Sequence, residues 1–366
     1  MKLCFIGDAE SIHTQRWVRW FADDHDVSVI ATTGDESLAD LTAATLPASA
    51  TLRLAASVRA VRRTLRSLQP DIVHAHFINE AGWFAAAAGR RPFVVSAWGS
   101  DIYRAPAESR LAARLNPWAA RRADAVTCDS RDQADALNAW GVERDHIEVV
   151  NWGVDRREFH PGVDGRPFRD RLGIPADAPV VLSPRQWLAN SNVGAIVRAH
   201  ARMRSDAHLI LKRLPRFERD AGKDVLDAVE ASPRRDRIRV VEEIEPSELP
   251  GMYAAADLVV SLCTTDGTPV SPLEAMAMGR LVLALRNPSV AEWVGEPGGR
   301  LVDTLEAAAL AGELDGLVER RGDQPGAAHN LGVVEARADR AAEMARVAAL
   351  YERLTTRPRH HGGRGG

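Results

Sequence analysis

The sequence predicts an α/β protein in which two domains each carry a parallel sheet. Short apolar runs of strand length alternate with segments of helical periodicity through most of the 366 residues, and this alternation is typical of parallel strands joined by helices. A chain of this length can form two domains with separate cores. A polar stretch without periodicity at residues 156–172 interrupts the alternation, which predicts a linker between the domains.

Each further element is expected where an apolar run or a helical stripe occurs. In the first half the predicted strands are residues 2–6, 26–31, 51–54, 71–75, 93–97, 125–128 and 147–150, and the predicted helices are residues 12–22 and 58–68. In the second half the predicted strands are residues 180–182, 208–211, 237–241, 257–262 and 281–285, with a helix at residues 193–203. Residues 335–354 are predicted to form a last helix. Residues 355–366 cannot bury a core and are expected to be disordered.

Composition argues against several classes of function. The net charge of −3 gives no reason to expect a nucleic acid partner. The three cysteines, Cys4, Cys128 and Cys263, lie in or next to predicted strands, so they are interpreted as buried residues of a reducing compartment. No apolar stretch has membrane-spanning length, and the run at residues 2–6 is too short for a signal peptide. We expect a cytoplasmic protein. A peripheral position at the inner face of the membrane is compatible with this expectation.

The most informative stretch is residues 264–277, where a predicted strand leads through a turn into a helix. Gly267 allows the backbone to approach a ligand closely. Thr268 is expected to be the N-cap and Pro269 the first helical residue, where its missing N–H group has no consequence. A helix start presents unpaired N–H groups and the positive end of the dipole, so this turn is suited to a phosphate.

Two acids flank the helix start. Asp266 precedes the helix and Glu274 lies inside it. A carboxylate that accepts from two neighbouring hydroxyls is a common way to hold a ribose or a hexose. Phosphate and hydroxyl contacts together predict a nucleotide-sugar site. A helix cap with a solvated Glu274 is the alternative interpretation.

This stretch resembles glycosyltransferase family 4, the retaining transferases of the two-domain GT-B fold. The family pattern is E-x7-E followed by A-M-A, and here Asp266 replaces the first glutamate while Glu274 and residues 275–277 match. The resemblance implies that Glu274 holds the ribose, and that Asp266 and the backbone of Gly267, Thr268, Pro269 and Val270 meet the sugar and the diphosphate.

The resemblance also implies the domain organisation. Two Rossmann-like domains are expected to face a central cleft, an acceptor-side domain at residues 1–160 and a nucleotide-sugar domain at residues 173–334. The helix at residues 335–354 is expected to pack back on the first domain. The family marks the crossing between domains with N-G-V-D, into which this chain inserts Trp152.

In α/β folds ligands bind at the carboxyl ends of strands, where Arg185 follows one predicted strand and Lys212 another. A guanidinium can grip a diphosphate bidentately. The resemblance implies an arginine that stabilises the leaving diphosphate, and Arg185 is given that role. Ser191 replaces the companion lysine of the family, so Lys212 is the predicted substitute. An ordinary surface arginine is the alternative for Arg185.

On the first domain, His13 lies in the loop after the first strand and His76 at the end of another. His13 is expected to contact the acceptor or the diphosphate, or else to be a helix-start residue satisfied by backbone, and His76 is expected to face the cleft. Trp98 stands where many family members have a histidine that meets the donor sugar. A tryptophan cannot accept a proton but can stack on a sugar ring, and Asp101 is expected to take a hydroxyl of donor or acceptor.

No pair of acids stands out as general acid and general base, and no D-x-D motif lies at a strand end. The resemblance implies that the departing phosphate oxygen takes the proton of the acceptor, while the protein supplies positioning and charge stabilisation. Neither a metal nor another cofactor is therefore expected. The expected donor is a nucleotide-sugar, and the expected acceptor is a hydroxyl of a glycan, a lipid-linked molecule or a small molecule.

The predicted role is in cell-surface polysaccharide, glycolipid or secondary-metabolite glycoside synthesis. Two alternatives stay open. One is a nucleotide-sugar epimerase of the same fold. The other is a catalytically silent GT-B partner protein, which Trp98, Ser191 and Asp266 motivate.

Two segments are rich in arginine. Residues 41–70 contain no acid and include Arg53, Arg59, Arg62, Arg63 and Arg66, and residues 110–122 carry further arginines beside Trp118. Arginines beside apolar residues predict contact with an anionic membrane. An ordinary solvated face is the alternative that composition alone favours.

Overall fold

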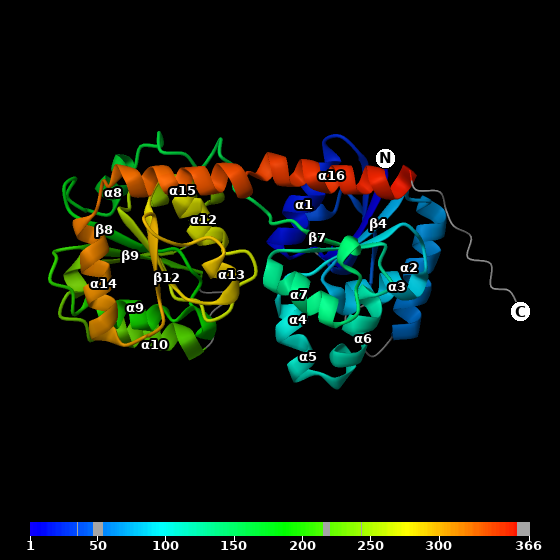
Figure 1. The fold of residues 1–366 in the computed structure, drawn as a ribbon, viewed down its shortest axis with the longest axis horizontal. Helices are drawn as coiled ribbons and strands as arrows, with labels where there is room; N and C mark the ends of the chain where they lie inside the picture. The colour runs from blue at the N-terminus through cyan, green and yellow to red at the C-terminus, as the bar shows by residue number, and fades with distance from the viewer. Residues whose placement is uncertain (35, 47–53, 215–219, 243, 357–366) are drawn as a thin grey trace, which may run out of the picture. The chain divides into compact units, whose positions relative to one another are not determined.

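The computed structural model describes residues 1–34, 36–46, 54–214, 220–242 and 244–356 (Figure 1). The chain forms two compact units. The first comprises Met1–Asn151 together with Ala345–Gly366, and the second comprises Trp152–Met344. Each unit contains its own parallel sheet, with seven strands in the first and six in the second. The predicted fold class of two parallel-sheet α/β domains is confirmed.

The sheet of the first unit has the strand order β3-β2-β1-β4-β5-β6-β7. Its strands are β1 (Lys2–Asp8), β2 (Asp26–Thr33), β3 (Thr42–Thr45), β4 (Ile72–His76), β5 (Phe93–Ser96), β6 (Ala125–Cys128) and β7 (Ile147–Val149). Its helices include α1 (Ile12–Ala22), α2 (Leu54–Leu68), α3 (Trp83–Ala88), α4 (Ser100–Tyr103), α5 (Ala105–Glu108), α6 (Arg110–Ala120) and α7 (Arg131–Ala139). The order reverses between β1 and β4, and ligands of such sheets bind at this switch point.

Every residue of β4, β5 and β6 is buried, as expected for parallel strands that helices cover on both faces. The buried polar side chains of these strands bond to one another. His74 is 2.8 Å from the Ser96 hydroxyl, which is 2.7 Å from the Thr127 hydroxyl. His74 also contacts the Tyr351 hydroxyl of the last helix, α16 (Arg340–Thr356). This chain of contacts joins α16 to the core of the first unit.

The sheet of the second unit has the strand order β10-β9-β8-β11-β12-β13. Its strands are β8 (Val180–Ser183), β9 (His208–Arg213), β10 (Ile238–Glu242), β11 (Leu258–Ser261), β12 (Leu281–Leu285) and β13 (Gly299–Val302). Its helices include α8 (Arg166–Arg171), α9 (Val193–His200), α10 (Asp220–Glu230), α11 (Leu249–Ala254), α12 (Val270–Ala277), α13 (Pro288–Ala291), α14 (Ala307–Glu319) and α15 (Gln324–Arg337). Here the switch point lies between β8 and β11.

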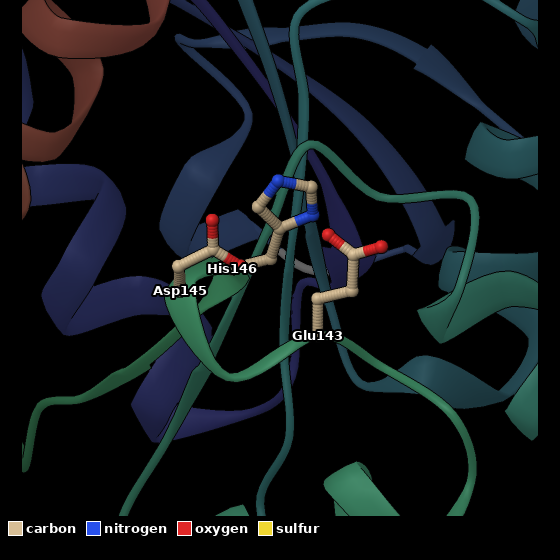
Figure 2. Close-up of side chains that lie close together, drawn as sticks. All are labelled: Glu143, Asp145 and His146. Carbon is tan, nitrogen blue, oxygen red and sulfur yellow. The ribbon is translucent and has the colours of Figure 1, made fainter.

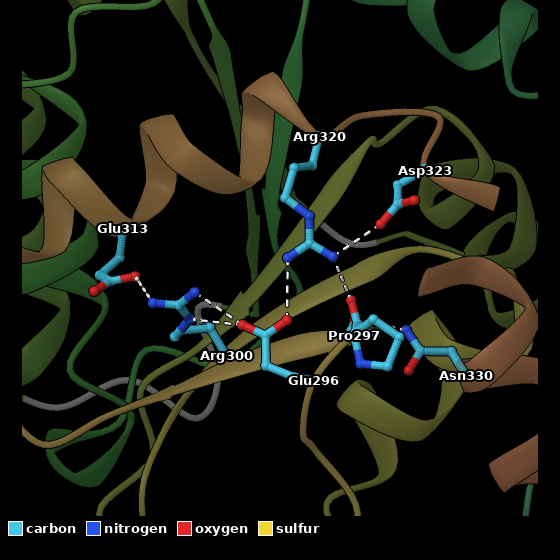
Figure 3. Close-up of polar contacts among 8 residues, drawn as sticks. Glu296, Pro297, Arg300, Glu313, Arg320, Asp323 and Asn330 are labelled. Atoms are coloured by element: carbon cyan, nitrogen blue, oxygen red, sulfur yellow. Dashed lines mark hydrogen bonds and ion pairs between the residues drawn. The ribbon is translucent and has the colours of Figure 1, made fainter. Parts of the chain in front are cut away.

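A polar network holds β13 against α14 and α15 (Figure 3). Its ion pairs are Arg300 with Glu296 and Glu313, which are exposed, and Arg320 with Glu296 and Asp323, which are partly buried. Surface pairs of this kind each contribute about 0–1 kcal/mol. The network also contains a buried hydrogen bond. The Asn330 side-chain amide donates to the Gly298 carbonyl at 2.8 Å. These contacts are therefore structural.

The structure accounts for the inserted Trp152. The backbone of Val154 bonds to Ala338 and Arg340, at 2.7 Å and 3.1 Å, so the two segments near the unit boundaries run side by side. Trp152 is buried beneath this contact, with the Arg340 guanidinium 4.9 Å from its ring. Gly153 has φ +70, and a Cβ there would lie 2.7 Å from the Arg340 Cα. The insertion is therefore a packing element of the second unit.

Several predicted boundaries were wrong. The expected linker at residues 156–172 contains α8, and the expected helix at residues 335–354 is broken, since α15 ends at Arg337 and α16 begins at Arg340. Leu54 begins α2 rather than ending a strand, while residues 51–53 lie outside the described part. Strands β3 and β13 were missed. Of the tail, residues 355 and 356 end α16 and the rest lies outside the described residues.

None of the described helices combines the length and the apolar character needed to cross a membrane.

Candidate functional site

An ion pair marks the carboxyl edge of the second sheet. Arg185 follows β8 and Asp266 follows β11, and these two strands are neighbours. Arg185 Nη1 lies 3.1 Å from Asp266 Oδ2, with 19% and 11% of the two side chains exposed. The two residues are far apart in sequence and meet because parallel strands end at the same edge of a sheet. The structure therefore brings together the two catalytic candidates of this domain.

Burial and mutual attraction act in opposite directions on the two charged groups of the pair. Burial raises the pKa of Asp266, and the positive charge of Arg185 opposes this shift. Burial disfavours the charged guanidinium, but Asp266 and other neighbours outweigh it and the pKa of Arg185 is raised. Arg185 is thus a stable cation at the sheet edge, whose counter-ion is a single carboxylate.

Glu274 lies inside α12 and is 7% exposed. Its Oε2 accepts a hydrogen bond from the Tyr253 hydroxyl at 2.7 Å. Tyr253, on α11, is itself buried, and burial followed by the charge of Glu274 raises its pKa well above the ordinary value. The tyrosine therefore stays a donor and fixes the glutamate side chain, so Glu274 is an ordered residue and not a solvated one.

The turn before α12 differs from the prediction in one respect. The N-cap is Pro269 and the helix begins at Val270, so Thr268 is not the N-cap, and no side chain caps the helix. The Thr268 hydroxyl is buried without a hydrogen-bond partner among the described residues. The Gly267 carbonyl accepts from Ser289. The Val270 N–H already bonds to the Thr268 carbonyl, so the buried Thr268 hydroxyl is the polar group that this turn offers to a ligand.

Neighbouring loops are tied to this edge of the sheet. Asn190 accepts from the Thr264 N–H at 2.9 Å, and Asn287 donates to the Cys263 carbonyl at 3.1 Å. Ser191 is buried. Lys212 lies one residue before the end of β9, in register with Val241. Its proposed role as the companion lysine stays a prediction.

An aromatic cluster forms the corresponding edge of the first unit. The Trp98 ring lies 4.8 Å from the His13 ring, 5.7 Å from the His76 ring and 6.0 Å from the Trp17 ring, measured between centroids. His13 comes from the start of α1 and His76 from the end of β4. The three residues predicted from separate loops are therefore brought into one cluster, and Trp17 is a fourth member that sequence reasoning missed.

The cluster holds polar atoms that lack partners among the described residues. These buried atoms are Nδ1 of His13, both ring nitrogens of His76 and Nε1 of Trp98. Burial, followed by the neighbouring Arg16, lowers the pKa of His13 to about 4. Burial, followed by His13, lowers the pKa of His76 to about 3. Both histidines are therefore neutral near pH 7, and the cluster offers uncharged groups that suit hydroxyls.

Asp101 is fully buried at the start of α4. Its two oxygens accept from the backbone N–H groups of Ile78, at 2.9 Å, and Trp98, at 3.0 Å. Burial raises its pKa to about 6, against the effect of these hydrogen bonds. These contacts make Asp101 a positioning residue that fixes the backbone of Trp98. A contact between Asp101 and a substrate hydroxyl stays a prediction.

A strained turn and a buried amide support the same edge. Phe77, directly after β4, has φ +72, which is rare for a bulky residue and persists only where surrounding structure enforces it. Asn116 donates to the Asp101 carbonyl and to Asn79, both at 2.7 Å, and accepts from Trp83 at 2.7 Å. Nothing in the local sequence predicts Asn116, because it acts through residues of other elements. The same holds for Tyr253.

One group of the described residues could in principle hold a metal ion, namely Glu143, Asp145 and His146, whose ligand atoms lie within 4.8 Å of one another. Figure 2 shows the His146 ring turned toward the Glu143 carboxylate. Both acids are exposed, and the group lies on one short turn before β7. Exposed acids of this kind are common without a metal, so the cluster supports no metal function.

Two sequence families match the chain. The family described as Glycosyl transferase 4-like matches residues 2–130, and the family described as Glycosyl transferases group 1 matches residues 190–320. The first match contains the aromatic cluster, and the second contains Glu274 and Asp266.

Curated relatives are similar at low identity. A D-inositol 3-phosphate glycosyltransferase of Xylanimonas cellulosilytica is 27% identical over 266 residues, which cover 68% of this chain and 63% of the relative. An MMP alpha-(1->4)-mannosyltransferase of Mycolicibacterium hassiacum is 28% identical over 194 residues, which cover 52% of this chain and 44% of the relative. The matched segments thus span less than two thirds of the length of these relatives.

Solved structures share the fold over nearly the whole chain. Anabaena Alr3699/HepE in complex with UDP has a TM-score of 0.83 at 21% identity, covering 97% of this chain and all of that one. Sucrose-phosphate synthase from Thermosynechococcus elongatus has a TM-score of 0.79 at 18% identity, covering 97% and 99%. Residues 2–130 thus match the Glycosyl transferase 4-like family and residues 190–320 match the Glycosyl transferases group 1 family, in a chain that shares the two-domain fold of these solved structures.

Proposed function

We propose that the chain is a retaining glycosyltransferase that moves a sugar from a nucleotide-sugar donor to a hydroxyl acceptor and needs no metal ion. The observation that carries the proposal is the Arg185–Asp266 pair at the ends of two adjacent strands, just before the start of α12. The relatives named as glycosyltransferases and the structural neighbour in complex with UDP support it.

The diphosphate of the donor is proposed to replace Asp266 as the ion-pair partner of Arg185. A guanidinium has five N–H donors, and the pair with Asp266 engages Nη1. A diphosphate carries more negative charge than one carboxylate, so it competes effectively for Arg185. The start of α12 adds positive charge without a metal. Glu274, fixed by Tyr253, would accept from the ribose hydroxyls, and Asp266 would accept from the sugar.

In the proposed reaction, the bond between the anomeric carbon and the diphosphate breaks as a bond to the acceptor oxygen forms on the same face. The acceptor proton passes to the departing phosphate oxygen. The low pKa values of His13 and His76 make both imidazoles weak bases, which supports a scheme without a protein base on the first unit. The protein then contributes orientation and stabilisation of the developing charge.

The acceptor is proposed to be a hydroxyl of a glycan, a lipid-linked molecule or a small molecule, bound by the first unit. Trp98 would stack on a sugar ring, with Asp101 holding the backbone of Trp98 in place. The uncharged cluster around Trp98 supports a hydroxyl-bearing ligand. A cytoplasmic position, peripheral at the inner face of a membrane, belongs to the same proposal and rests on composition.

The experiment begins with a thermal-shift panel of nucleoside diphosphates and continues with turnover of the matching nucleotide-sugar. Arg185→Ala is expected to lower turnover by roughly 10²–10³ in a donor-saturated assay. Arg286→Ala is the matched control, because it removes an exposed ion pair with Asp303. An unchanged rate for Arg185→Ala would remove this residue from the mechanism. The anomeric configuration of the product, read by NMR, tests retention.

The same assays separate the two alternatives. An epimerase would form an isomer from the donor with no acceptor present. A silent partner protein would show a nucleotide affinity that is weak or unchanged by Glu274→Ala. A transferase loses nucleotide affinity in Glu274→Ala and forms product only with an acceptor.

A further inference from the structure

A groove on the surface of the first unit is separate from the site described above. Its volume is about 370 Å³, which falls in the range of about 300–1,000 Å³ that is typical of ligand pockets. Helices α2, α3 and α6 form its walls. The apolar lining includes Leu54 and Val58 of α2, Trp83 and Ala87 of α3, and Leu115 and Trp118 of α6.

The walls offer hydrocarbon and few groups for hydrogen bonding. The Trp83 indole N–H is already donated to Asn116 at 2.7 Å, so this wall is fixed and its polar atom is used. Arg62, at the rim, donates to the Ala87 carbonyl at 2.6 Å and so closes the end of α3. A polar ligand would lose hydrogen bonds to water in this groove without gaining others. The shape is preformed, and its interior suits an alkyl chain.

The three helices that wall the groove carry charge of one sign. Helices α2, α3 and α6 contain no acidic residue and six arginines, which are Arg59, Arg62, Arg63, Arg66, Arg110 and Arg114. The whole chain, in contrast, has a net charge of −3. The four arginines of α2 follow helical spacing and are exposed. Arg59 lines the groove and has no ion-pair partner among the described residues.

We propose that the groove binds an acyl chain of an anionic lipid at a bilayer surface. An apolar interior with a cationic rim complements an amphiphile that has a hydrocarbon tail and a negative head group. An acidic protein segment would also attract the arginines, but its backbone would find no partners on the apolar wall. This lipid site goes beyond the proposed transfer reaction, and it is tested without donor or acceptor.

The first test is co-sedimentation of the full chain with vesicles of phosphatidylglycerol and phosphatidylcholine, compared with vesicles of phosphatidylcholine alone. Binding is expected only with the anionic vesicles. Each arginine near an anionic surface contributes about fivefold to affinity, so Arg59→Gln with Arg63→Gln is expected to weaken binding about 30-fold. Arg202→Gln with Arg321→Gln removes the same charge from exposed positions of the second unit and is expected to leave binding unchanged.

A second test separates insertion into the groove from plain charge attraction. Ala87→Phe fills the groove without changing any charge, and it is expected to weaken vesicle binding and to abolish calorimetric binding of dodecyl phosphate. Inorganic phosphate is expected not to bind the wild-type chain. Leu54→Asn, at an exposed part of the wall, makes the same test if thermal unfolding shows that Ala87→Phe does not fold.

The proposal is overturned if the chain fails to bind anionic vesicles. It is also overturned if whichever of Ala87→Phe and Leu54→Asn folds binds vesicles and dodecyl phosphate as the wild type does. Nucleotide binding in the thermal-shift panel is expected to be the same in all these variants, so that failure here is distinguishable from failure of the proposed transferase function.

Discussion

The hydrogen bond between Tyr253 and Glu274 orients the carboxylate of the candidate nucleotide site, and Tyr253→Phe removes it together with a contact between the tyrosine hydroxyl and Ser271. The bond is 2.7 Å long and buried, with 1% of the tyrosine and 7% of the glutamate exposed. Hydrogen bonds to charged groups contribute about 1.5–3 kcal/mol to stability. The variant leaves the ring in place, so the loss comes from a buried carboxylate that has lost a donor.

The expected result is a lower unfolding temperature. At about 2–4 °C per kcal/mol for a unit of this size, the loss is about 3–12 °C. Calorimetry of the full chain measures it, and binding of nucleoside diphosphates is expected to weaken because Glu274 is no longer held in one position.

The chain contains a matched control. Tyr103 also donates to a carboxylate, that of Asp132, but it is 42% exposed. Tyr103→Phe is the same chemical change at the surface, where the partner can be solvated by water instead. Its expected effect is at most about 1 kcal/mol. Equal unfolding temperatures for Tyr253→Phe and Tyr103→Phe would refute the reasoning, since burial would then make no difference to the bond.

Three further outcomes are expected. Gly153→Ala should destabilise the chain by more than Gly173→Ala in denaturant unfolding, since both glycines have positive φ but only at Gly153 would a Cβ strike backbone, that of Arg340. His76 has a folded pKa of about 3, so it contributes stability that is present above pH 6.5 and is lost as pH falls toward 3. His76→Gln should therefore reduce the stability loss between pH 7 and pH 4.5 by about 2 kcal/mol, and a pH profile equal to that of the wild type would contradict this. EDTA should leave turnover unchanged, and loss of activity that Mg²⁺ restores would contradict metal independence.

The periodicity of apolar residues was sufficient to predict the α/β class and most strands, because a buried parallel strand has the same local signature wherever it lies. The same local reasoning placed Arg185 and Asp266 in the loops after two predicted strands, and the family resemblance supplied their expected roles. It failed at boundaries. Thr268 was expected to be the N-cap from its type and position, but the backbone enters α12 at Pro269. The break between α15 and α16 was missed because it depends on pairing with Val154.

The linear sequence thus determined which residues stand at strand ends and which chemistry each can perform. Only the tertiary structure decided which of these strand ends are neighbours, because strand order is not encoded in any local pattern. The Arg185–Asp266 pair exists because β8 lies beside β11. Tyr253 and Asn116, which hold Glu274 and Asp101 in position, likewise became recognisable only through contacts across the fold.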